Sequence, residues 1–104
     1  MVKFNKVIRD KIPEIIQKDG NDCNIQILSD EKFLIEIEKK LSEELNEYQN
    51  DKNPEELADI LEVIYRIAQL KGVSKEELEK IRVKKLQDRG GFEKNLFLID
   101  TSEP

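Results

Sequence analysis

Three long runs of the chain carry apolar residues at helical spacing, and breaks of only a few residues separate them. These runs span about 30–50, 54–72 and 74–90. Within each run the apolar positions recur every three or four residues in a charged background, which predicts an amphipathic helix. Helices joined by such short loops pack side by side in antiparallel order. The pattern therefore predicts an all-α antiparallel helix bundle.

The remaining segments are predicted to form minor elements of a single domain covering residues 1–104. Pro13 at a first helical position and Gly20 as a stop indicate a short helix over about 13–19. Apolar residues alternate in 24–28 and again in 95–99. We expect these two segments to pair as a small β element, or the tail to cross as an arm onto a partner chain.

The size and charge of the chain limit its partners. Its 104 residues, 39% charged and 38% hydrophobic, suffice for one core but are few for a cleft enclosed by one protomer, so oligomerisation is expected. The net charge of −5 disfavours binding to nucleic acid or to an anionic membrane. No stretch approaches the roughly 20 apolar residues of a membrane span, and we expect a cytoplasmic protein.

The composition also excludes two classes of site within one chain. The sequence has no His and a single cysteine, Cys23. A Cys/His zinc site, a His-based catalytic triad and an internal disulfide therefore cannot form. We interpret Cys23 as a small structural side chain, because nothing in the chain supplies a catalytic partner for it.

Two pairs of acidic residues flank the break between the first two long helices. Glu44 and Glu47 are three residues apart on the first, and Glu56 and Asp59 are three apart on the second. Residues at this spacing project from one side of a helix. Because the turn between the helices is short and the helices antiparallel, all four carboxylates are predicted to face each other.

The helical positions of these acids favour a metal site. Glu44 lies beside Ile37 on its helix and Glu56 about 20° from Val63, so both border the apolar stripe. Carboxylates packed together in partly dry surroundings must be protonated or share a cation. An all-oxygen site selects Mg²⁺ or Mn²⁺ over zinc. Glu43 is a further candidate, either supporting the ligands or holding a second ion.

The alternative interpretation of each acid is a solvated helix surface or a capping residue. Glu56 follows Asn53 by three residues, as in a capping box, and acids in a first helical turn complement the helix dipole. Neither role requires two spaced pairs brought face to face by one turn. For the set of four, the metal site is therefore the favoured interpretation.

Basic residues at the end of the third long helix suggest the reaction. Lys85 and Arg89 are four residues apart on one side of the helix, a cationic strip suited to polyphosphate oxygens. Metal carboxylates together with such cations indicate hydrolysis of a phosphoanhydride. Glu44 or Glu47, where not fully committed to the metal, is the candidate acceptor of the proton from the attacking water.

At these residues the sequence resembles the all-α NTP pyrophosphohydrolase superfamily, which includes MazG and the phosphoribosyl-ATP pyrophosphohydrolases. The signature of that superfamily is a Glu-Glu-x-x-Glu helix followed by a Glu-x-x-Asp helix, which stand here at 43–47 and 56–59. The segments 5–16 and 89–92 resemble a compact MazG-like subgroup of prokaryotes and phages. The resemblance spans about 5 to 94.

The resemblance implies an activity and a set of site residues. The reaction would convert an NTP or dNTP to the monophosphate and pyrophosphate, often to clean the nucleotide pool. The assembly would be a homodimer or a dimer of dimers whose site is completed by the second subunit. The implied Mg²⁺ ligands are Glu44, Glu47, Glu56 and Asp59, and the implied phosphate-binding residues are Lys85 and Arg89, joined in this subgroup by Arg9 and Lys11.

Two other functions remain open from the sequence. The same apolar stripes could serve a non-catalytic helical interaction module, in which the acids form a solvated or Ca²⁺-binding surface. Phosphoribosyl-ATP is an alternative substrate for the same fold.

Overall fold

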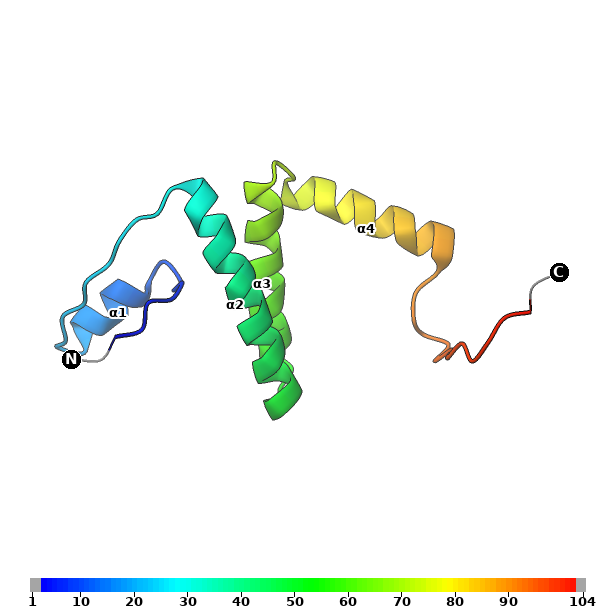
Figure 1. The fold of residues 1–104 in the computed structure, drawn as a ribbon, viewed down its shortest axis with the longest axis horizontal. Coiled ribbons are helices and arrows are strands. Elements are labelled where there is room, and N and C mark those ends of the chain that lie inside the picture. The colour runs from blue at the N-terminus through cyan, green and yellow to red at the C-terminus, as the bar shows by residue number, and fades with distance from the viewer. Residues whose placement is uncertain (1–2, 103–104) are drawn as a thin grey trace.

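The computed structural model describes residues 3–102, and over that range it contains four helices and no strand (Figure 1). The helices are α1 (Ile12–Lys18), α2 (Asp30–Asp51), α3 (Glu55–Leu70) and α4 (Lys75–Arg89). The prediction of an all-α fold is confirmed, and each helix begins and ends within two residues of its predicted range.

Serine side chains cap the starts of α2 and α4. The Ser29 hydroxyl accepts a hydrogen bond from the backbone N–H of Lys32 at the start of α2. At the start of α4, Ser74 Oγ accepts from the Glu77 backbone N–H and donates to the Glu77 carboxylate, both at 3.1 Å. Each cap satisfies a backbone donor that the first helical turn leaves free. α2 ends where Lys52 takes the left-handed conformation, with φ 57°.

The α2–α3 hairpin is the packed part of the chain. Ile37 of α2 and Val63 of α3, 5% and 6% exposed, are its most buried side chains. Arg66 of α3 lies over the Phe33 ring of α2, 5.7 Å from its centroid, and is 3.8 Å from the Asp30 carboxylate. These contacts fix the register of the hairpin, which brings the later turns of α2 beside the first turns of α3.

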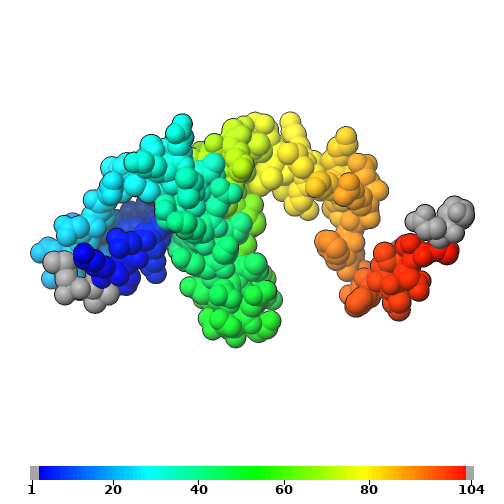
Figure 2. All heavy atoms as spheres, viewed as in Figure 1, coloured from blue at the N-terminus to red at the C-terminus, as the bar shows by residue number. Residues whose placement is uncertain are grey.

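The rest of the molecule extends away from this hairpin (Figures 1 and 2). α4 packs against α3 only near the turn that joins them and then projects outward. The chain measures 66 × 32 × 23 Å, and its radius of gyration is 18.6 Å, against about 13 Å for a compact chain of this length. Its accessible surface is 9806 Å², whereas a compact protein of this mass exposes roughly 6,000 Å².

Much of that additional surface is apolar. The large hydrophobic residues that are substantially exposed on the helices include Ile35, Leu45, Leu57, Leu61, Ile81 and Leu86. None of the helices within residues 3–102 is both long and apolar enough to cross a bilayer.

The expected small β element does not form within the described residues. The segments 24–28 and 95–99 lie on opposite sides of the hairpin, one before α2 and the other after α4 (Figure 1). Without a neighbouring strand, neither segment can form the hydrogen bonds that join the strands of a sheet. Ile27 and Phe97 are almost fully exposed, so alternation alone was insufficient to predict a strand here.

Candidate metal centre

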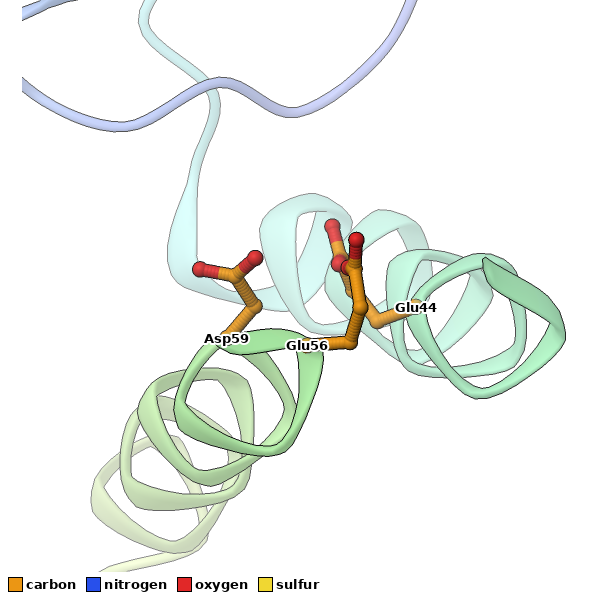
Figure 3. A group of neighbouring side chains, drawn as sticks. All are labelled: Glu44, Glu56 and Asp59. Carbon is orange, nitrogen blue, oxygen red and sulfur yellow. The ribbon is translucent and has the colours of Figure 1, made fainter. Parts of the chain in front are cut away.

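Three carboxylates converge where α2 and α3 lie side by side. Glu44 of α2 and Glu56 and Asp59 of α3 each offer an oxygen, and these oxygens lie within 4.8 Å of one another. Figure 3 shows the Glu44 and Glu56 side chains next to each other and Asp59 one turn further along α3. Mg²⁺–oxygen distances of about 2.1 Å put opposite ligands about 4.2 Å apart. A small divalent ion therefore fits among these carboxylates after minor side-chain adjustment.

Burial distinguishes this cluster from a solvated acidic surface. Glu44 is only 7% exposed, and it is the buried charged residue of the described chain. The Oε2 atoms of Glu44 and Glu56 are both inaccessible to solvent and have no hydrogen-bond partner. A buried carboxylate oxygen without a partner is strongly unfavourable. Two such oxygens in one cluster are the feature that a bound cation would satisfy.

The electrostatics of Glu56 are consistent with such a cluster. Removal from water raises the pKa of the Glu56 carboxyl, and the negative charge of the adjoining Glu47 raises that pKa further. The charges of Asp59 and Asp51 act in the same direction. A divalent cation would reverse this effect, because it stabilises the ionised carboxylate.

The helix repeat explains why Glu44 and Glu56 are drawn inward. Glu44 follows Ile37 by seven residues, and Glu56 precedes Val63 by seven residues. Seven residues make almost two helical turns and displace a side chain by only about 20° around the helix. Each carboxylate therefore continues the stripe whose apolar members form the hairpin core.

Glu47 does not join the group of three. It is exposed and adjoins Glu56 instead, which leaves its carboxylate open to solvent. Glu43 is also exposed.

The N-terminal segment approaches the same cluster through Arg9. The Arg9 Nη2 atom donates to Asp59 Oδ1 at 2.7 Å, between residues 50 positions apart in the chain. Both side chains are substantially exposed, so the ion pair is worth little on its own and can exchange for another partner. Arg9 is thus a predicted phosphate-binding residue that lies beside the carboxylates. Lys11, two residues later, is exposed at the start of α1.

The other predicted phosphate-binding residues do not reach the cluster within one chain. Lys85 and Arg89 are exposed residues of α4. That helix begins beyond the end of α3 opposite to Glu56 and projects away from the hairpin (Figure 1). Within one chain, Lys85 and Arg89 therefore lie away from the carboxylates, and their predicted role in binding phosphate stays a prediction.

The chain was compared with protein families, with curated proteins and with solved structures. No family model, curated protein or solved structure matches the chain.

Two residues near the carboxylates were not singled out from the sequence. Lys40 lies one helical turn before Glu44, and its Nζ atom is 3.2 Å from Glu44 Oε1. Asp51, at the end of α2, adds to the negative potential at Glu56. The four-residue spacing of Lys40 and Glu44 is visible in the sequence, but it is common on solvated helices, so burial is what makes Lys40 notable.

Proposed function

We propose that this chain is a Mg²⁺-dependent nucleoside triphosphate pyrophosphohydrolase of the all-α type, hydrolysing an NTP or dNTP to the monophosphate and pyrophosphate. The observation that carries the proposal is the pair of buried, unpartnered carboxylate oxygens of Glu44 and Glu56 in a group with Asp59. The nearby Arg9 guanidinium adds a cation of the kind that binds phosphate.

Each residue of the centre has a role in this proposal. Glu44, Glu56 and Asp59 hold the ion, which when bound would offset negative charge on the phosphate oxygens. Glu47, exposed and outside the group of three, is the better-placed acceptor for the proton of the attacking water. Arg9 leaves Asp59 and binds a phosphate oxygen, so that the substrate replaces one charged partner of the guanidinium by another.

We further propose that the functional form is a homo-oligomer. The single chain exposes several thousand Å² more than a compact protein of its mass, and obligate dimers bury about 2,000 to more than 5,000 Å², counted over both partners. A second copy packed against the apolar residues of the hairpin and of α4 would cover them. The α4 of that copy is then the source of Lys85 and Arg89 for the substrate phosphates.

The competing function is a non-catalytic interaction module, which the same exposed apolar surface favours. A module with solvated acids accounts for the surface but gives no reason for two buried carboxylate oxygens that lack a partner. A module with a Ca²⁺-binding surface would account for these oxygens but gives no reason for the Arg9 guanidinium beside them. For these reasons the hydrolase is the stronger proposal.

A nucleotide panel separates these functions. The purified chain, with Mg²⁺, is incubated with the canonical NTPs and dNTPs, nucleotides with damaged bases and phosphoribosyl-ATP, and both pyrophosphate and orthophosphate are measured. We expect pyrophosphate and a monophosphate from at least one nucleotide, with no orthophosphate and no turnover in EDTA. Hydrolysis of phosphoribosyl-ATP alone would identify the alternative substrate. The absence of turnover on every nucleotide would favour the interaction module.

A further inference from the structure

Lys40 is the only partner that the structure gives to the buried Glu44 carboxylate within the described residues. Its Nζ atom lies 3.2 Å from Glu44 Oε1, and its side chain is 19% exposed. Glu44 Oε2 is buried without a partner. One oxygen of the carboxylate is therefore engaged by an ammonium group, and the other is left for a ligand.

The orientation of this pair argues against a role in helix stability. Lys40 precedes Glu44 by four residues, and the reverse order, with Glu first, is the one that stabilises helices better. The neighbouring Lys39 follows Glu36 in that favourable order at 3.3 Å and is 64% exposed. α2 thus contains an ordinary surface ion pair and, one residue later, a lysine directed at a predicted metal ligand.

The number of free oxygens on Glu44 affects which ion the centre prefers. Mg²⁺ requires near-octahedral coordination at about 2.0–2.1 Å and takes one oxygen from each carboxylate, whereas Ca²⁺ accepts both oxygens of a carboxylate at about 2.3–2.6 Å. A carboxylate whose Oε1 is held by an ammonium group is limited to one bond to the ion. Ca²⁺ thereby loses the second bond that it can make to a carboxylate, whereas Mg²⁺ keeps the single bond that it uses.

We propose that Lys40 is a positioning residue that makes the centre selective for Mg²⁺ over Ca²⁺ by engaging one oxygen of Glu44. The inference rests on the proposed function insofar as Glu44, Glu56 and Asp59 hold the ion. It adds a specificity determinant that acts through Glu44 without touching the substrate.

The test is a competition between ions for the centre. Binding of Mn²⁺ is followed by the electron paramagnetic resonance of the free ion, and Mg²⁺ and Ca²⁺ are titrated as competitors. Lys40→Met keeps the apolar stem but removes the ammonium group, and Lys39→Met is the matched control with the same charge change on the same helix. Lys40→Arg keeps a cation that can engage Glu44 Oε1.

The expected result concerns the ratio of the Ca²⁺ and Mg²⁺ dissociation constants. Loss of a positive charge strengthens both divalent ions alike, so the ratio removes that general effect. We expect Lys40→Met to lower the ratio of Ca²⁺ to Mg²⁺ dissociation constants about tenfold, since both oxygens of Glu44 become available. Lys39→Met should leave the ratio unchanged, and Lys40→Arg should stay close to the wild type.

The possible failures are distinguishable. An unchanged ratio in Lys40→Met, with Mn²⁺ still bound, would overturn the role of Lys40 and leave the metal centre standing. No Mn²⁺ binding by the wild type would overturn both. Circular dichroism verifies the helicity of each variant, and Lys40→Ala provides the same comparison if Lys40→Met does not fold.

Discussion

Replacing Glu56 by Gln is expected to lower nucleotide turnover by at least about 100-fold, while making the metal-free protein more stable. A bound metal ion stabilises the charge of the transition state by several kcal/mol, and loss of one carboxylate ligand removes part of that stabilisation. Each increase of about 1.4 kcal/mol in the activation free energy lowers the rate tenfold. The amide retains the shape of the side chain but is a poor ligand for a hard cation. Steady-state turnover with saturating Mg²⁺ measures the first effect.

The gain in stability follows from the pKa of Glu56. Its carboxyl has a pKa raised above the ordinary value of 4.5 by removal from water and by the charge of Glu47. The unfolded chain, with the lower pKa, therefore loses its proton more readily than the folded one, and stability falls as the pH rises through the raised pKa. Gln does not titrate, so this loss is absent from the variant.

Thermal unfolding in EDTA across a pH series measures the second effect. Wild type and Glu56→Gln should have similar melting temperatures near pH 4, and the variant should have the higher melting temperature once the pH exceeds the raised pKa. Excess Mg²⁺ should reverse the order, because only the wild type binds the ion well. Glu55→Gln, the same change at the exposed neighbouring residue, is the control and should show neither effect. A Glu56→Gln variant with full turnover would remove Glu56 from the centre.

Substituting Lys for Ile81 is expected to dissociate the oligomer and to abolish turnover with it. Ile81 lies on α4, is 49% exposed in the single chain, and has little of its own chain to pack against because α4 projects from α3. A lysine there would carry a charge into the proposed interface, where an unpaired buried charge costs several kcal/mol. Sedimentation equilibrium gives the mass, and the nucleotide assay gives the activity.

Gln87 provides the matched control for this substitution. It lies on the same helix about 120° around from Ile81, and Gln87→Lys introduces the same side chain with the same change of charge. For an isolated chain, both substitutions would fall on exposed positions of a projecting helix and would behave alike. Equal masses and equal activities for the two variants would therefore contradict the proposed assembly.

The boundaries of the long helices were predictable where local residues encode them. Ser29 and Ser74 cap the helices that follow them, and Gly90 takes a positive φ at the end of α4. The convergence of Glu44 and Glu56 was predictable for a related reason, since the seven-residue spacing from Ile37 and Val63 places both acids on the packed stripe.

The remaining features depend on contacts that are distant in the sequence. The ion pair of Arg9 with Asp59 joins residues 50 positions apart, and no local pattern specifies it. The three-residue spacing predicts Glu47 among the metal ligands, because residues three apart share a helix side, but the hairpin buries only Glu44 of that pair. The strand expected at 95–99 fails because an alternating pattern does not provide a neighbouring strand.

The most direct test of the metal centre is a crystal structure of the chain grown with Mn²⁺, using anomalous scattering to locate the ion. We predict an anomalous peak about 2.1–2.3 Å from carboxylate oxygens of Glu44, Glu56 and Asp59, with Arg9 no longer paired to Asp59. Saturating Mn²⁺ with no peak among these three carboxylates, or with Glu44 Oε2 and Glu56 Oε2 directed away from the ion, would contradict it.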